Sequence, residues 1–402
     1  MGSGLLDLPL RSRLRSMRQQ LLPRIVRGRG PMRCCRTWCR EEETIDAVQT
    51  KGAVSTITYR EALYAAMREA LESNANALIL GQGVTDHKGT FGTTSGLAED
   101  FGHDRVLDTP LAEEGMMGVA VGAALNGLYP IQTHIRADFA LVAMNQIVNL
   151  VAKYRYMFGG RFEIPMLIRM VIGRSWGQGA QHSQSLQSLF AHIPGLTVIM
   201  PATPESILVD YRHATSSFRG PVISLEHRLM YDLAFEKESQ RFEPLSTRRL
   251  REGKDVTIVS TSIMTLEAVR AAGHLMEHGI DCEIIDLNCV SHPDADVIID
   301  SVRKTGRLIV ADTSWQAYGV SAEICRLVVE RDPGALKSPV VTMGMEPAPC
   351  PTAKALEDIY YPNLSTLTDA IAELVTGNAG HGLPLPDEQS MADVYKRFKG
   401  PF

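Results

Sequence analysis

Short apolar runs alternate with helical patterns along most of this chain, and that alternation limits the possible folds more than any other feature. In the first half, strand-like runs occupy 77–81, 130–133, 165–168, 196–200 and 222–225, and helical patterns occupy 113–126, 139–157, 184–192 and 204–215. Parallel neighbours in a sheet need crossover connections, which are usually helices. The sequence therefore predicts a doubly wound α/β domain over 54–235.

The alternation stops at a polar, charge-rich segment, 236–252, and then restarts. Strand-like runs follow at 256–260, 282–287, 308–312 and 340–343, with helical patterns at 264–277, 295–303 and 320–331 between them. This pattern predicts a second, smaller α/β domain over 253–376, with 236–252 as the linker. The Gly- and Pro-containing residues 377–402 are expected to form a C-terminal arm that docks or stays loose.

The first clear helix start is Thr58-Tyr-Arg-Glu61, a capping box that precedes an apolar stripe to about Leu71. Residues 1–50 before it show no pattern that could build a core. Residues 1–40 hold ten Arg, no Lys and one acidic residue, Asp7. Such a composition is similar to a mitochondrial transit peptide, and a disordered arm or an over-extended reading frame fits it as well. We expect a cytoplasmic protein, or a mitochondrial matrix protein if this segment is a targeting signal.

Charge, apolar run length and cysteine usage exclude several classes of protein. Residues 41–402 carry 31 basic and 45 acidic residues, a net charge of −14, so a nucleic-acid partner is not expected. The longest apolar stretch, 116–131, is broken by Gly, Asn and Pro, and falls short of the roughly 20 residues that span a bilayer. The seven cysteines include no CxxC pair, which predicts free thiols in a reducing compartment and no zinc site.

Two acidic residues, Glu113 and Glu114, fall in the first turn of the helix predicted at 113–126. Acids at this position favour a helix through its dipole, and that purely structural role explains them without any chemistry. Along the same helix, glycines at 115, 118 and 122 leave one face without side chains. Such a face suits the close approach of another backbone or subunit.

Two further candidates follow predicted strands, where open parallel sheets bind their ligands. A glycine-bearing loop, 177–184, carries His182 to a helix start, although a lone histidine is more often structural than catalytic. Phe139 follows the strand at 130–133 and suits either stacking on a planar ring or the core. The sequence lacks GxGxxG, GxxxxGK[ST] and GDG followed by Asn, so it offers no complete phosphate-binding motif of its own.

At these residues the chain resembles the β subunit of the heterotetrameric E1 component of 2-oxo acid dehydrogenases, within the wider transketolase fold. The resemblance covers about 54–375. It rests on Tyr59-Arg-Glu-Ala-Leu, Phe101-Gly-His-Asp-Arg-Val-Leu-Asp-Thr-Pro-Leu-Ala-Glu113, Gly118-Val-Ala-Val-Gly-Ala-Ala, Asp138-Phe139, Gln146-Ile-Val-Asn149, Gln181-His-Ser-Gln184, His192-Ile-Pro-Gly-Leu196 and Lys304-Thr-Gly-Arg-Leu.

The resemblance implies a pyrimidine-binding domain, a transketolase C-terminal domain and thiamine diphosphate as the cofactor. Glu113 matches the glutamate that binds N1′ of the aminopyrimidine, and so promotes the imino tautomer that removes the C2 proton. Phe139 matches the aromatic residue that stacks on the aminopyrimidine, and Leu111 the apolar residue that packs against the cofactor. His182 matches the active-site histidine that hydrogen-bonds the 2-oxo acid.

The resemblance also implies partners. The family carries GDG…Asn, which holds Mg²⁺ and the diphosphate, on an α subunit. The chain is thus expected to form half of a composite site in an α₂β₂ tetramer docked to a lipoyl-bearing E2. The implied reaction is oxidative decarboxylation of a 2-oxo acid with acyl transfer to lipoamide.

The chain departs from the family pattern at Gln82, Gly83, Thr133 and Arg136, and the family's potassium loop is altered at 214–220. Two alternatives therefore stay open. One is a split transketolase-like or carboligating enzyme subunit, and the other is a non-catalytic scaffold with the same fold.

Overall fold

The computed structural model describes residues 56–174, 177–236 and 242–386. Every described residue belongs to one compact unit of the chain, Ala53–Phe402. The Arg-rich segment and the end of the predicted C-terminal arm lie outside the described residues. Across the described part of the chain, no helix is both long and apolar enough to cross a membrane.

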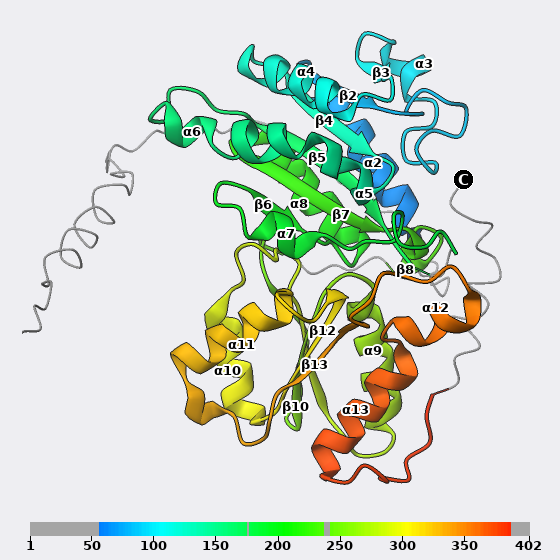
Figure 1. Cartoon of the computed structure of the whole chain (residues 1–402), viewed down its shortest axis with the longest axis vertical. Helices are drawn as coiled ribbons and strands as arrows, with labels where there is room; N and C mark the ends of the chain where they lie inside the picture. Colours follow the sequence, from blue (N-terminus) through cyan, green and yellow to red (C-terminus); the bar gives the residue numbers. More distant parts are fainter. Residues whose placement is uncertain (1–55, 175–176, 237–241, 387–402) are drawn as a thin grey trace, which may run out of the picture. The chain divides into compact units, whose positions relative to one another are not determined.

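The first sheet has six parallel strands in the order β3-β2-β4-β5-β7-β6 (Figure 1). The strands are β2 (Ala77–Gly81), β3 (Val106–Asp108), β4 (Tyr129–His134), β5 (Met166–Ile172), β6 (Thr197–Ile199) and β7 (Pro221–His227). Both faces of β5 are buried, and its successive side chains enter two different core clusters. Burial on both faces explains why this strand is continuously apolar apart from Arg169.

Helices cover both faces of the first sheet. On one face lie α2 (Tyr59–Ser73), α3 (Leu97–Phe101) and α8 (Pro204–Ser216); on the other lie α4 (Glu113–Leu125), α5 (Ala137–Ala140), two short turns (Leu141–Ala143 and Gln146–Val151), α6 (Tyr154–Met157) and α7 (Gln187–Ala191). The predicted capping box at Thr58 and Glu61 is confirmed, with both reciprocal hydrogen bonds formed.

The prediction of a single helix over 139–157 is wrong. The structure breaks this segment into α5, a 3₁₀ turn, a π-helical turn at Gln146–Val151 and α6. Apolar spacing reports which face of a segment is buried, but it does not separate i→i+4 from i→i+5 hydrogen bonding.

The second sheet has five strands in the order β13-β12-β10-β11-β9. These are β9 (Arg248–Arg251), β10 (Val256–Ser260), β11 (Cys282–Asp286), β12 (Leu308–Trp315) and β13 (Val341–Met345). Only β9 runs antiparallel to its neighbour, and it lies inside the segment predicted as a linker. The predicted domain limits stay a prediction. The first strand of the second sheet begins at Arg248, five residues before the predicted start of the second domain.

Four helices pack on the second sheet, α9 (Ile263–Met276) and α13 (Leu364–Thr376) on one face, α10 (Ala295–Thr305) and α11 (Val320–Arg331) on the other. A further helix, α12 (Lys354–Tyr360), follows β13. The start of the predicted arm docks on α9, because His274 Nε2 donates to the carbonyl oxygen of Pro384 at 2.8 Å. Outside the two main sheets, β1 (Thr56–Thr58) pairs with β8 (Ala234–Glu236).

Residues of both sheets share one buried cluster, which contains Ile168 of β5 and Val310 of β12. Polar contacts accompany it, since Gln187 Nε2 donates to Asp312 Oδ1 at 2.8 Å between two buried side chains. The four described cysteines are free, as predicted for them. The predicted fold class, α/β with two doubly wound domains, is confirmed.

Candidate functional site

Three loops meet where neighbouring strands of the first sheet end. Gly81 of β2 is in register with Asp108 of β3 and with Thr133 of β4, so the residues after all three strands lie at one edge. The carboxylate of Asp108 ties two of these loops together by accepting hydrogen bonds from the backbone N–H of Gly83 at 2.8 Å and of Thr109 at 2.9 Å. This edge is where a parallel sheet binds its ligand.

Glu113 stands at this edge as the first residue of α4, with its side chain half-buried. Gln82, from the loop after β2, donates a hydrogen bond from Nε2 to Glu113 Oε1 at 3.0 Å. Glu114 is exposed and accepts instead from Gln146 Nε2 at 3.2 Å. The two acids therefore differ in surroundings, and only Glu113 faces the strand ends.

A small hollow beside Glu113 contains polar atoms with no hydrogen-bond partner. Its lining includes Gln132, Thr133 and His134 of β4, and the buried Oε1, Oγ1 and Nε2 atoms of these residues are unpaired. Burial lowers the pKa of His134 to about 4, against the opposing pull of the Glu113 carboxylate, so this ring is neutral at pH 7.

Unpaired acceptors and a carboxylate beside an aromatic ring fit the donors and acceptors of an aminopyrimidine. Phe139, in α5, lines the same hollow and supplies the ring. The side chains at this edge thus suit the pyrimidine end of thiamine diphosphate.

The ring of Phe139 meets His182 edge to face, with centroids 5.5 Å apart and an interplanar angle of 89°. The loop that carries His182 is held by Asp138, whose Oδ1 accepts from Gln184 at both the backbone N–H, at 3.3 Å, and Nε2, at 2.8 Å. Burial raises the pKa of Asp138, and the hydrogen bonds from Gln184 oppose that shift. Gly179, at φ +70°, lets this loop turn where a side chain would be strained.

The structure brings three of the four predicted site residues together. Phe139 belongs both to the small hollow with Glu113 and to a larger cavity with His182, so it connects the two. Leu111 is 84% exposed and lines neither, and its predicted contact with a cofactor stays a prediction. The assigned roles of the other three also stay predictions, now with a shared location.

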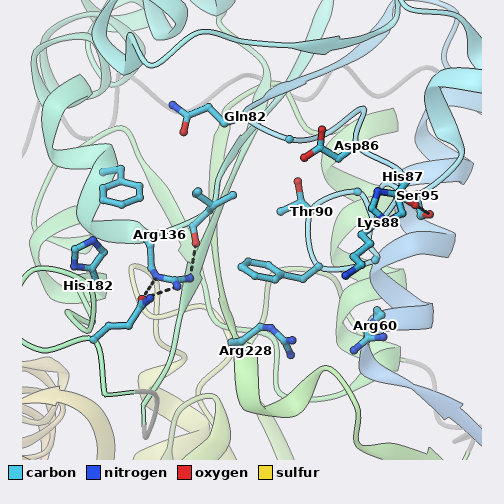
Figure 2. A pocket seen from close by; sticks show the side chains of 17 residues that line it. Arg60, Gln82, Asp86, His87, Lys88, Thr90, Ser95, Arg136, His182 and Arg228 are labelled. Atoms are coloured by element: carbon cyan, nitrogen blue, oxygen red, sulfur yellow. Dashed lines mark hydrogen bonds between the residues drawn. The ribbon is translucent and has the colours of Figure 1, made fainter. Parts of the chain in front are cut away.

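The larger cavity, of about 880 Å³, groups residues that share no motif in the sequence (Figure 2). Its wall includes Arg60, Lys88, Thr90 and Arg228 in addition to Arg136. In the linear chain Arg60 is only the middle of a capping box, and Arg228 follows a strand with no motif around it. No local pattern could have found this set, because its members come from four separate segments. The described residues contain no group of three or more His, Cys, Asp or Glu side chains placed to hold a metal ion.

The fold and the two hollows define a two-domain protein of the transketolase class that contributes a pyrimidine-binding edge. Family models agree: residues 55–232 match "Transketolase, pyrimidine binding domain" and residues 246–367 match "Transketolase, C-terminal domain". A solved "Split gene transketolase, inactive beta4 tetramer" superposes with a TM-score of 0.67 at 26% identity, covering 80% of this chain and 98% of that one.

Curated relatives narrow the class. The "Pyruvate dehydrogenase E1 component subunit beta" of Rhizobium meliloti (strain 1021) is 37% identical over 81% of this chain and 71% of its own length. Its mitochondrial counterpart from Bos taurus is 35% identical over 80% and 92%. The "Acetoin:2,6-dichlorophenolindophenol oxidoreductase subunit beta" of Cupriavidus necator is 38% identical over 72% and 86%. The chain belongs to this family of pyruvate and acetoin dehydrogenase E1 β subunits.

Proposed function

We propose that this protein is the β subunit of a thiamine diphosphate-dependent 2-oxo acid dehydrogenase E1. The reaction is the oxidative decarboxylation of a 2-oxo acid, with transfer of the acyl group to lipoamide. The observation that carries the proposal is the joint placement of Glu113, Phe139 and His182 around two connected hollows at the carboxyl edge of the first sheet. The names of the relatives support the same reaction class.

Each residue has a separate task in this proposal. Glu113 shares a proton with a ring nitrogen of the cofactor, and Gln82 fixes the carboxylate through its hydrogen bond to Oε1. Phe139 supplies an aromatic face for the pyrimidine, and His182 hydrogen-bonds the oxygen of the 2-oxo acid. When bound, thiamine diphosphate supplies the nucleophilic carbon and the electron sink for loss of CO₂.

The site is proposed to be completed by an α subunit that holds Mg²⁺ and the diphosphate, in an α₂β₂ tetramer that delivers acyl groups to a lipoyl-bearing E2. The surface around α4 supports a partner there. A Cβ built on Gly118 or Gly122 meets nothing within 4 Å, and Leu111 and Val119 beside them are exposed. The solved split transketolase, assembled from β chains alone, is an inactive tetramer.

The relatives include bacterial and mitochondrial chains. We propose the cytoplasm as the location, or the mitochondrial matrix if residues 1–50 are a targeting segment.

The proposal is tested by reconstituting the full chain with its α partner, thiamine diphosphate and Mg²⁺, and measuring oxidation of pyruvate and branched 2-oxo acids with lipoamide. Glu113→Gln is expected to lower kcat by about 10²–10⁴-fold, the range of a lost acid–base group, while the tetramer still assembles. Glu114→Gln is the matched control, because this neighbouring acid is exposed and hydrogen-bonds Gln146 instead; its turnover should stay near that of the unmodified protein.

Unchanged turnover in Glu113→Gln would remove the proposed role of this carboxylate. Ketol transfer between sugar phosphates without any need for lipoamide would instead support a split transketolase-like enzyme.

A further inference from the structure

The cavity beyond Phe139 and His182 has a strongly basic wall. Four basic side chains line it, Arg60, Lys88, Arg136 and Arg228, against a single lining carboxylate, Asp86. Figure 2 shows Arg60 and Lys88 on one side of the hollow and Arg136, next to His182, on the other side, with Arg228 between them. A 2-oxo acid with a small neutral side chain has no negative charge at its remote end that could pair with these cations.

Two of these arginines are buried and rigidly held. Arg136 and Arg228 are 3% and 8% exposed, and both guanidinium groups lie over the ring of Phe91, at 5.9 and 5.0 Å from its centroid. Arg136 also donates to Gln178 Oε1 from Nε at 3.1 Å and from Nη2 at 2.7 Å. Phe91 itself has φ +51°. A bulky residue is strained in this conformation, and such strained residues are found most often at functional sites.

The surrounding acids offset only part of this charge. Asp232 pairs with Arg60 and lies 3.8 Å from Arg228, and its own side chain is 57% exposed. Burial lowers the pKa of Arg136 to about 10; Asp138 opposes that shift, and the charge of Arg228 adds to it. Both arginines remain charged at neutral pH, so a bound anion would recover part of the cost of burying them.

A neutral donor completes the wall. The side chain of Thr90 is 3% exposed, and its Oγ1 has no hydrogen-bond partner. Thr90 lines the cavity together with Ser95, whose Oγ donates to the carbonyl oxygen of His87 at 2.9 Å. A buried hydroxyl without a partner beside clustered guanidinium groups indicates a ligand with several acceptor oxygens.

We propose that this cavity binds an anionic group at the end of the substrate remote from its reacting carbonyl, and that a phosphate monoester fills it better than a carboxylate. A phosphate monoester carries up to two negative charges and three terminal oxygens, which matches several cationic forks and a hydroxyl donor. This inference rests on the proposed function, which places the reacting carbonyl of the substrate at His182. The position of the anionic end follows from the cavity itself.

The test is a calorimetric titration of the full chain, assembled with its α partner and thiamine diphosphate, with three probes: glycerol 3-phosphate, glutarate and glycerol. Glycerol 3-phosphate should bind, glutarate more weakly, and glycerol not measurably. Arg228→Met and Lys88→Gln should each weaken glycerol 3-phosphate binding by about tenfold or more, the loss of one charge-assisted contact.

Arg212→Met is the matched control, since Arg212 pairs with Glu69 on the exposed surface of α8, away from the cavity. Its binding of glycerol 3-phosphate should be unchanged. If Arg228→Met fails to fold, Lys88→Gln decides the question, because the Lys88 side chain is exposed and its loss leaves the core intact.

Equal binding of glycerol and glycerol 3-phosphate, or binding that neither cavity variant weakens, overturns the inference. Tighter binding of glutarate overturns the preference for phosphate. Because binding is measured without turnover, a complex that oxidises no 2-oxo acid but binds glycerol 3-phosphate through Arg228 would remove the proposed function and leave this site standing.

Discussion

His134 illustrates how burial at the site edge determines protonation. Its ring lies at the end of β4, 4% exposed, with Nε2 unpaired and the Glu113 carboxylate nearby. The pKa of His134 is lowered to about 4 from an ordinary 6.5 because the fold buries the neutral ring. The folded chain therefore takes up the proton only near pH 4, whereas the unfolded chain takes it up near pH 6.5.

The buried neutral ring thus makes its full contribution to the free energy of unfolding above about pH 6.5, and this contribution is lost as the pH falls toward 4. Between pH 7 and pH 5, protonation of His134 should lower the unfolding free energy of the unmodified chain by about 2 kcal/mol. His134→Phe should abolish this part of the pH dependence. Urea unfolding at both pH values measures this. The unfolding free energy should still depend on pH to a smaller extent, because burial also lowers the pKa of His227.

His103→Gln serves as the control for this titration, because its side chain is exposed. A pH dependence in His134→Phe as steep as that of the unmodified chain would show that the ring is not held neutral in the fold.

At the scale of elements, β5 and β7 are joined by a buried ion pair. Arg169 donates to both carboxylate oxygens of Glu226, at 2.7 and 2.8 Å, and both side chains are fully buried. Tyr231 donates to the same carboxylate at 2.7 Å, and Tyr211 donates to it as well. The pair and the two hydroxyls thus form one buried polar network inside an apolar layer.

Arg169→Met should lower the free energy of unfolding by about 3–5 kcal/mol, because it leaves Glu226 charged and buried without its cation. Denaturant unfolding of the full chain measures the change. The control is Arg326→Met, which breaks only exposed pairs with Glu323 and Glu330 and should cost less than about 1 kcal/mol. A loss below about 1 kcal/mol in Arg169→Met would contradict the network.

Element prediction succeeded where burial on both faces left a plain apolar run. The observed β2 spans the residues predicted for it, and β10 does as well. No strand was predicted where an apolar run is absent. The segment from Arg248 to Arg251 is charged and falls within the predicted linker, yet it forms an edge strand. Backbone pairing with β11 places it there, and hydrophobic periodicity carries no signal for such pairing.

At the scale of the whole molecule, Asp210 links the two α/β parts. Its carboxylate, on α8, accepts from the backbone N–H of Leu245 at 2.7 Å and from Asn288 Nδ2 at 2.8 Å, and it pairs with Arg248 of β9 at 3.3 Å. Burial raises the pKa of Asp210, and the Arg248 guanidinium opposes that shift. One side chain of the first part therefore holds two segments of the second, 245–248 and the loop after β11.

Asp210→Asn should lower the unfolding free energy by about 3–5 kcal/mol, since it leaves Arg248 charged and buried. Because the lost contacts join the two parts, scanning calorimetry should also show the single transition separating into two. In Asp210→Asn/Arg248→Met the buried charge is gone, so part of the loss should be recovered. A variant that melts in one transition at the original temperature would show that Asp210 does not couple the parts.

The sequence by itself determined the fold class and the family, and it predicted three site residues that the structure places close together. Strand and helix periodicities are local, and the motifs around Glu113 and His182 are contiguous, so both survive in a linear chain. Only the tertiary structure decided that Phe139 connects two hollows, that Gln82 hydrogen-bonds Glu113, and that the arginines at 60, 136 and 228 share one cavity. These side chains come from segments far apart in the chain, and the sheet's carboxyl edge brings them together. Charge and burial at that edge depend on neighbours in space, which no local spacing encodes.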